Sequence, residues 1–347
     1  MDAADLQGGA GRDGTGHDTA GHDGAGAATG RTAFMIFTHY LTPRIRRLVD
    51  RARADLPHDV HVVGFFRDPA QAPEEFRTEP GFEIVTPDDL RALGYPAKAA
   101  ADPLPLIPGN CDMIVLHFMR AHPEYDALWN WEGDADFTGD LNDFCGPFDR
   151  DGGDLACANV RWPIRSWPWS GWRVIPESWP ADFDRPMRCF LPVCRVSRRF
   201  TEALDAFYRA GGDGHHEWSW TYVARVRDLV FEDFGGDGPF VREGRRNRFY
   251  LRNRKGNLLL GTHQHSLPLE RPGRRPDTLY HPIKDRSVSA REWVSKRLQG
   301  IRGGLAMVLT GGNAWGQPRD VSAWRRFDRP PNAGPNAAPR SGGASDT

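Results

Sequence analysis

Four acidic side chains crowd into the segment "WNWEGDADFTGD" at residues 129–140. They are Glu132, Asp134, Asp136 and Asp140. Neighbouring carboxylates repel one another, and strands disfavour aspartate, yet the residues before the cluster have the pattern of a strand. The cluster is therefore either a solvated turn or a place where carboxylates face a cation. If the strand continues, Glu132, Asp134 and Asp136 lie on one face.

A calcium loop of the EF-hand type is excluded. From Asp134 the pattern D-x-D-x-T-G partly imitates such a loop, but its twelfth position needs a bidentate glutamate and Cys145 occupies it. The segment before the cluster also has the pattern of a strand rather than a helix. A Mg or Mn ion with oxygen ligands stays a candidate, because such ions keep coordination positions for phosphate oxygens.

The elements that would position this cluster begin just after residue 32. The apolar run 33–37 predicts a buried strand, and residues 58–66 predict a second one. Between them, Thr42 and Pro43 suit the cap and first position of a helix with one apolar face. This β-α-β unit predicts a parallel sheet. The first strand lacks a Gly-rich phosphate loop, which argues against a dinucleotide-binding Rossmann site or a P-loop.

Further elements follow along the chain. We expect a weak helix at 87–94, strands at 111–121 and 124–136, a helix at 198–212, a second helix after 214–217, and a helix near 289–299.

The acidic segment resembles the metal-binding motif of glycosyltransferases with the GT-A fold. More narrowly, "YDALWNWEGDADFTGD" is similar to bacterial and fungal glycosyltransferases related to the core-2/I-branching type. In that family an aromatic strand ends in E-x-D, followed by an aromatic residue and T/S-G. The match here is Glu132-Gly133-Asp134, Phe137 and Thr138-Gly139. "DLACANVRWP" and "TLYHPIK" also resemble family segments, and the resemblance runs in order over residues 33–285.

The resemblance implies a GT-A-like α/β fold with a mixed, mostly parallel sheet flanked by helices. It also implies a nucleotide-sugar donor, usually a UDP-sugar, whose diphosphate is bridged by Mn or Mg. Two overlapping acid pairs are present, so the metal pair is either Glu132 with Asp134 or Asp134 with Asp136. Some branching enzymes work without metal and use basic residues, which leaves metal dependence open.

Several residues elsewhere are candidates for contact with the donor. Thr38, His39 and Tyr40 end the first strand, and ligands of open α/β sheets bind outside the carboxyl ends of strands. Arg44 lies one turn later and is a candidate phosphate contact; an ordinary strand end is the alternative.

Late in the chain, "TLYHPIK" supplies two more candidates. By analogy with GT-A enzymes, His281 completes the metal site and Lys284 places a charge near phosphate. A packed turn with an exposed lysine is the alternative.

The segment "GHHE" at 214–217 is the candidate source of a general base. An inverting transferase needs a carboxylate to take the proton of the acceptor hydroxyl. Glu217 is the first choice and Asp213 the second, while His216 would position the acceptor or the base. Capping and surface roles are the alternative, and the sequence does not decide between inversion and retention.

Composition restricts partners and location. The net charge is −1, so no global field draws the protein to nucleic acid. The basic stretch 241–255 has a solvated strand face as its default interpretation, with RNA or a phosphorylated lipid carrier as alternatives. No apolar run is long enough to span a bilayer, although peripheral membrane contact stays open. Five cysteines without C-x-x-C spacing favour a reducing, cytoplasmic location.

The sequence therefore predicts a metal-assisted glycosyltransferase acting on a glycan or lipid-linked acceptor. The alternative is a non-catalytic protein that binds carbohydrate or nucleotide sugar on a degenerate version of the fold. We expect one domain over 33–316 between two disordered tails, 1–32 and 317–347, that are rich in Gly or Pro.

Overall fold

The computed structural model describes residues 30–100, 109–151, 153–161, 173–180, 187–252, 261–263 and 269–284. Both predicted tails, apart from residues 30–32, lie outside these ranges, as do residues 162–172 and the helix expected near 289–299. The single domain over 33–316 extends past the last described residue and stays a prediction.

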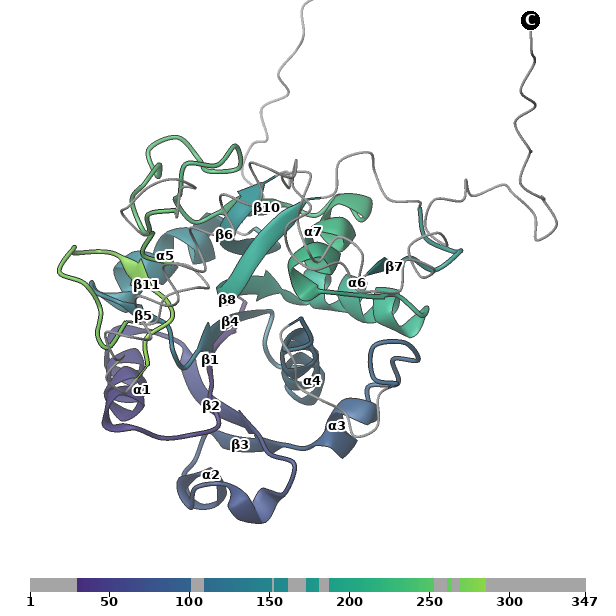
Figure 1. Ribbon diagram of the computed structural model, residues 1–347, viewed down its shortest axis with the longest axis horizontal. Coiled ribbons are helices and arrows are strands. Elements are labelled where there is room, and N and C mark those ends of the chain that lie inside the picture. The colour runs from purple at the N-terminus through teal and green to yellow at the C-terminus, as the bar shows by residue number, and fades with distance from the viewer. Residues whose placement is uncertain are drawn as a thin grey trace, which may run out of the picture.

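Seven strands form the central sheet, in the order β10-β6-β8-β4-β1-β2-β3 (Figure 1). β8 runs antiparallel to both of its neighbours, and the other pairs are parallel. The predicted mixed, mostly parallel sheet is confirmed. The strands of this sheet are β1 (Thr32–Phe37), β2 (Asp59–Phe65), β3 (Phe82–Val85), β4 (Ala127–Glu132), β6 (Leu155–Arg161), β8 (Arg188–Ser197) and β10 (Phe231–Asp233).

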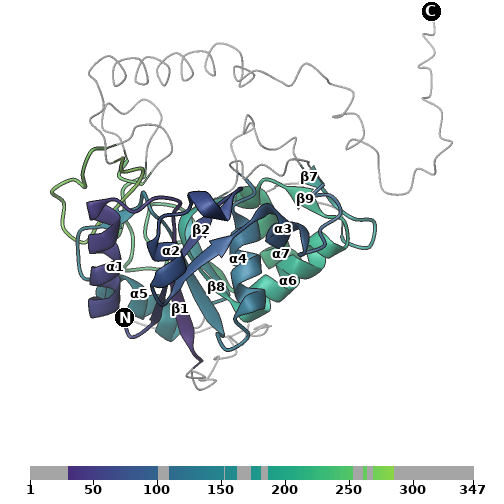
Figure 2. The ribbon, with the colours of Figure 1, turned by 90° about the horizontal axis from the view of Figure 1, so that it is seen from below.

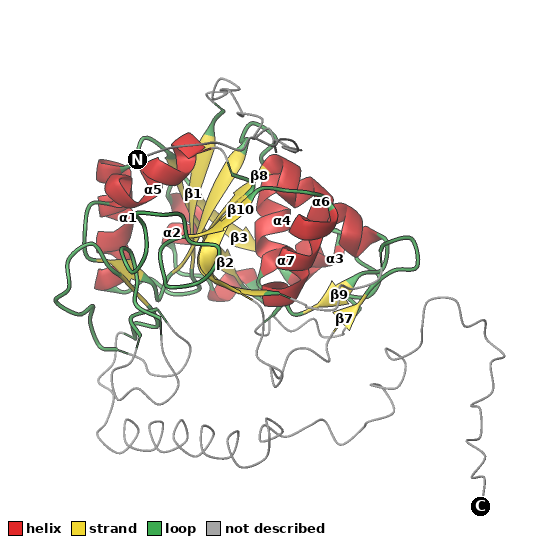
Figure 3. Ribbon diagram, turned by 90° about the horizontal axis from the view of Figure 1, so that it is seen from above, coloured by secondary structure: helices red, strands yellow, loops and turns green. Residues whose placement is uncertain are grey.

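Helices cover both faces of the sheet (Figures 1 and 3). One face carries α1 (Pro43–Asp55) and α5 (Leu141–Asp151); the other carries α3 (Pro87–Arg91), α4 (Asp112–Ala121), α6 (Arg198–Arg209) and α7 (His216–Val226). The remaining short elements are η1 (Pro69–Gln71), α2 (Glu75–Thr78), β5 (Asp136–Phe137), β7 (Arg173–Val174), β9 (Asp213–Gly214) and β11 (Leu279–Tyr280). None of the helices in the described ranges is both long and apolar enough to cross a membrane.

The predicted β-α-β start is confirmed. The Thr42 hydroxyl caps α1 by accepting from the amide of Ile45 at 3.4 Å, and Pro43 takes the first helical position, where its missing N–H costs nothing. β1 and β2 then pair in parallel, from Ala33 opposite Asp59 to Phe37 opposite Val63.

The strand expected at 111–121 is wrong, because these residues form α4. A continuous apolar run does not distinguish a buried strand from a buried helix by periodicity. Here the run is buried almost all around, since α4 lies between the sheet and the helices α3 and α6 (Figure 2). A helix that is apolar on every side is what such a position requires.

The tryptophans in the described ranges fill the core. Trp129 and Trp131 of β4 have no exposed surface, and both lie on the α1/α5 face among rings such as Phe144. Leu128 and Asn130 alternate with them and point toward α4 and α7. Glu132, the last residue of β4, continues this second set, so its carboxylate leaves the sheet at the carboxyl edge on the α4/α7 side.

Candidate functional site

The strand order reverses between β1 and β4. From β1 the chain proceeds to β2 and β3 on one side, whereas β4 pairs with β1 on the other. Open α/β sheets bind ligands in the crevice at such a switch point, outside the carboxyl ends of the strands. Thr38 follows β1 there, and Glu132 ends β4 there.

Three candidate metal ligands meet at this crevice. Atoms of Glu132, Asp134 and His281 that are able to hold a cation all lie within 4.8 Å of one another. His281 Nε2 is 3.3 Å from an oxygen of Asp134 and 3.6 Å from an oxygen of Glu132. The structure thus brings together the first acid pair, Glu132 with Asp134, and the late histidine.

The side chains of this cluster shift one another's pKa values. Burial lowers the pKa of His281, but its hydrogen bonds to Asp134 and Glu132 outweigh burial and raise that pKa to about 9. Burial raises the pKa of Asp134, whereas His281 and Lys284 lower it well below its usual range. Lys284 forms an ion pair with the second oxygen of Asp134. The site therefore holds Asp134 as an ionised carboxylate that a cation other than a proton is able to bind.

The late segment that carries His281 is held in place by Thr138 of the acidic segment. Thr138 donates its hydroxyl to the carbonyl of Arg275 at 2.6 Å and accepts from the amide of Thr278 at 3.1 Å. β11 pairs with β5 beside these contacts, and the amide of Ile283 donates to the carbonyl of Asp134 at 2.7 Å. The late segment, residues 278–284, is thereby fastened against the acidic residues.

Gly133 sets the path of the chain between the two acids. A Cβ at this position would lie 2.8 Å from the Cβ of Thr38, closer than atoms pack. The amide of Gly133 donates to the carbonyl of Phe37 at 2.8 Å, and its carbonyl accepts from the guanidinium of Arg44. Arg44, predicted as a phosphate contact, therefore holds the backbone of the acidic turn.

Asp136 does not join the cluster. The strand stops at Glu132, so the shared face expected for three acids does not form. One oxygen of Asp136 accepts from Arg51 of α1 at 2.9 Å and from the amide of Phe137 at 2.8 Å. Asp140 likewise accepts from the backbone amides that open α5, as helix caps do.

The remaining candidates at the first strand end differ in their surroundings. His39 is exposed near the ion pair. Partial desolvation, followed by the charge of Lys284, lowers its pKa, while Asp134 opposes both. Tyr40 packs edge-on against His39 and touches the core. The Thr38 hydroxyl donates to the carbonyl of Tyr40 at 2.9 Å, so it stabilises the local turn.

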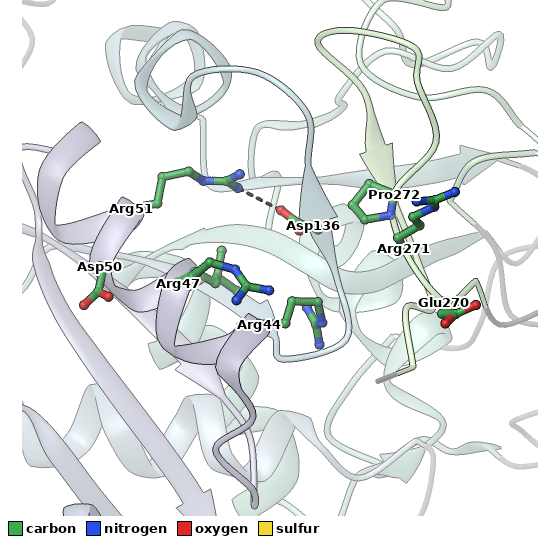
Figure 4. A pocket seen from close by; sticks show the side chains of 9 residues that line it. Arg44, Arg47, Asp50, Arg51, Asp136, Glu270, Arg271 and Pro272 are labelled. Atoms are coloured by element: carbon green, nitrogen blue, oxygen red, sulfur yellow. Dashed lines mark hydrogen bonds and ion pairs between the residues drawn. The ribbon is translucent and has the colours of Figure 1, made fainter. Parts of the chain in front are cut away.

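A pocket of about 540 Å³ lies next to the acidic turn, on the α1 side (Figure 4). Figure 4 shows Arg44, Arg47 and Arg51 projecting from α1, with Arg271 across the pocket. Its volume is in the range of small-molecule sites. The lining residues are Arg44, Arg47, Leu48, Asp50, Arg51, Asp136, Glu270, Arg271 and Pro272.

The candidate base lies at the same edge of the sheet but is covered. Glu217, in the first turn of α7, is 2% exposed, and its carbonyl accepts from the thiol of Cys189 at 3.4 Å. Burial lowers the pKa of neighbouring Arg188, and the charge of Glu217 only partly opposes this. His216 opens α7 and is half-buried, and Asp213 lies in β9, where its carboxylate accepts from the amide of Gly214.

Part of the basic stretch is paired with nearby acids. Arg242 and Arg245 both form ion pairs with Asp151 and Glu232, and Arg252 pairs with Asp237 at 2.7 Å. Residues 253–255 lie outside the described ranges. Over residues 241–252 the chain forms turns, so the strand expected there is wrong.

Sequence reasoning missed the residues that assemble the site. Arg51 separates Asp136 from the cluster, and Thr138 fastens the late segment. His263, with no exposed surface, packs its ring 5.6 Å from that of His281. Only Thr138 had a signal, as part of the family pattern. The contacts of Arg51 with Asp136, 85 residues away, and of His263 with His281 leave no trace in spacing.

No family model matches the sequence, and no curated protein matches it. Solved structures give distant similarities. One is a protein from Bacillus anthracis, described as a glucose-1-phosphate thymidylyltransferase and solved with sucrose. Its TM-score is 0.35 and its sequence identity 8%, and the match covers 58% of the present chain and 86% of the neighbour. Mouse xyloside xylosyltransferase 1 has a TM-score of 0.34 and 13% identity, and the match covers 59% of the present chain and 85% of the neighbour. Glucosyl-3-phosphoglycerate synthase from Mycobacterium tuberculosis, solved with UDP, has a TM-score of 0.30 and 12% identity. This match covers 63% of the present chain and 73% of the neighbour.

Proposed function

We propose that the protein is a glycosyltransferase that moves a sugar from a nucleotide-diphosphate donor, most simply a UDP-sugar, to a hydroxyl of a glycan or lipid-linked acceptor. One observation carries the proposal: Glu132, Asp134 and His281 meet at the point where the strand order reverses. Sheets of this kind bind ligands there, and this donor set suits a divalent cation beside phosphate.

The residues of the cluster fit Mn or Mg. Two carboxylates and one imidazole supply three ligand atoms, and the charge balance of the site accepts a dication in place of the His281 proton. Such a metal would neutralise the diphosphate as the leaving group acquires charge. Lys284 and His39 flank the same crevice, where an ammonium and an imidazole are able to contact phosphate oxygens.

We assign the proton transfer to Glu217, with Asp213 as the second candidate. Glu217 lies at the carboxyl edge next to Arg188, and a carboxylate there is able to accept a proton from the acceptor hydroxyl. Because Glu217 is 2% exposed, catalysis requires the acceptor to reach it within a closed site. Glu217→Gln is expected to abolish transfer while donor binding persists. If transfer is lost in Asp213→Asn but not in Glu217→Gln, the base is Asp213 instead of Glu217.

The arginine-lined pocket suits an anionic part of the acceptor. Arg44, Arg47 and Arg51 face it from α1 and Arg271 from the loop before β11, so its four arginines outnumber its three acids. Guanidinium groups bind phosphate in a bidentate manner. A lipid-linked acceptor carries such phosphates. The free thiols of all five cysteines support action in a reducing compartment such as the cytosol.

Burial of Glu217 favours one alternative, a protein that binds nucleotide sugar or glycan without turnover. Incubation with a panel of nucleotide sugars and Mn²⁺ distinguishes the two. The proposal predicts release of nucleoside diphosphate with one donor, lost in Asp134→Ala. Binding without turnover, unchanged in Glu217→Gln, would establish the alternative, and neither binding nor turnover with any donor would contradict the proposal.

A further inference from the structure

A second group of metal-binding side chains lies at the opposite edge of the sheet. His61 of β2, Glu83 of β3 and His122, which follows α4, place one ligand atom each within 4.8 Å of the others. His61 Nδ1 is 2.7 Å from one oxygen of Glu83, and His122 Nε2 is 3.1 Å from the other. This group, the His61–Glu83–His122 cluster, is near the amino ends of the strands and plays no part in the proposed transfer.

The hydrogen bonds around His61 fix its tautomer. A carboxylate only accepts, so Tyr125 donates its one hydroxyl proton to Asp59 across 3.1 Å. His61 Nε2, 3.0 Å from the same hydroxyl oxygen, must then donate to it. In a neutral ring this leaves the Nδ1 lone pair facing Glu83, an arrangement that needs a proton or a metal ion between the two atoms.

His122 is in the same position. Its Nδ1 lies 3.2 Å from an oxygen of Glu124, and its Nε2 faces Glu83. A neutral imidazole has one N–H, so it satisfies one carboxylate and directs a lone pair at the other. With Nδ1–H donated to Glu124, the free Nε2 lone pair converges on Glu83 together with that of His61.

Each histidine therefore has the support that metal-ligating histidines have. The second nitrogen of such a ring usually donates to a carboxylate, carbonyl or water, which sets its tautomer and raises its basicity. Glu124 plays this part for His122, and the Tyr125–Asp59 pair plays it for His61. The side chains of His61, Glu83 and His122 are 13%, 27% and 22% exposed, so a cation has access and a water is able to complete the coordination.

We propose that the His61–Glu83–His122 cluster binds Zn²⁺. Two imidazoles and one carboxylate form a nitrogen-rich donor set that suits Zn²⁺, in contrast to the oxygen-rich set around Asp134. Ligand atoms of a tetrahedral zinc site lie about 3.3 Å apart. The separations here, 2.7 Å and 3.1 Å to the two oxygens of Glu83, are hydrogen-bond distances, so the side chains must move apart by a few tenths of an ångström to hold the ion. Such an ion would tie the end of α4 to β2 and β3 and stabilise that side of the sheet.

The test measures Zn²⁺ binding by titration calorimetry and Co²⁺ binding by visible absorption, on the full chain. Wild type and Asp134→Asn are expected to bind at this site. Glu83→Gln and His122→Gln are expected to bind Zn²⁺ at this site with at least about tenfold weaker affinity. His58→Gln, which removes a half-buried histidine paired with Asp149 elsewhere, is the matched control and is expected to bind as wild type does. His17 and His22 of the N-terminal tail are present in every variant, so their contribution cancels.

Circular dichroism establishes that each variant folds. If Glu83→Gln or His122→Gln does not fold, Glu124→Gln at a more exposed position replaces it, with an expected loss of about tenfold in affinity. Equal Zn²⁺ affinity in folded wild type, Glu83→Gln and His122→Gln would overturn the proposal. So would the absence of Zn²⁺ binding to wild type at micromolar concentrations, which would identify the cluster as a hydrogen-bonded network only.

Discussion

Asp134 and Asp136 are two positions apart and have different partners. Asp134 faces His281 and Lys284, whereas Asp136 accepts from Arg51 on the other side of the turn. The sequence offered both as members of an acid pair. The end of β4 at Glu132 separates them, because the alternation that would align them does not continue.

A matched pair of substitutions tests this separation. Asp134→Asn is expected to weaken Mn²⁺ binding at least about tenfold, since it removes a charged ligand atom. Asp136→Asn removes the same charge nearby and is expected to leave Mn²⁺ affinity within about threefold of wild type. Titration calorimetry measures both. Equal losses in the two variants would place the metal between Asp134 and Asp136 instead.

Asp149 of α5 stabilises the α5 face of the sheet through His58 and Arg195. Burial raises the pKa of Asp149, but these two partners outweigh burial and lower the pKa from its usual value. A carboxylate with a lowered folded-state pKa adds stability above its unfolded pKa of about 4, and that stability is lost as the pH falls through the folded value.

We therefore expect the free energy of unfolding of wild type to exceed that of Asp149→Asn at about pH 7, and the difference to shrink toward about pH 3. Urea denaturation across this range measures it. A difference that stays constant, or grows as the pH falls, would show that the Asp149 charge does not stabilise the fold.

At the scale of elements, the site depends on how β1 and β4 end together. Gly133 crosses directly over Thr38, and the carbonyl of Gly133 accepts a hydrogen bond from Arg44 of α1. Thr138 then fastens the late segment that supplies His281. The acidic turn is thus fixed from α1, from β1 and from the late segment.

Gly133→Ala tests the close contact at the strand ends. The added Cβ would lie 2.8 Å from the Cβ of Thr38, so the turn must shift. We expect a loss of about 1–3 kcal/mol in stability, as for overpacking elsewhere, together with weaker Mn²⁺ binding. Gly153→Ala is the control, because its nearest neighbour would be 3.7 Å away. Thermal denaturation and Mn²⁺ titration check both variants; a Gly133→Ala protein identical to wild type in both would refute the account.

At the scale of the molecule, local patterns predicted the framework but not its long-range contacts. The capped helix α1 and the two strands around it followed from Thr42, Pro43 and the apolar runs. The strand predicted at residues 111–121 was wrong because a helix buried on all sides has the same apolar composition as a buried strand. The approach of His281 to Asp134 depends on β5 pairing with β11, and no spacing in the sequence encodes that pairing. Resemblance alone suggested this histidine.

The central claim is a metal-dependent site for a nucleoside diphosphate at the β1–β4 crevice. The most direct measurement is calorimetric titration of UDP into wild type, Asp134→Ala and Asp136→Ala, with and without Mn²⁺. Because coupling between two ligands is reciprocal, Mn²⁺ should strengthen UDP binding as much as UDP strengthens Mn²⁺ binding. The account predicts this coupling in wild type and Asp136→Ala and its loss in Asp134→Ala. UDP binding that is absent from wild type, or that persists with its full Mn²⁺ dependence in Asp134→Ala, would contradict it.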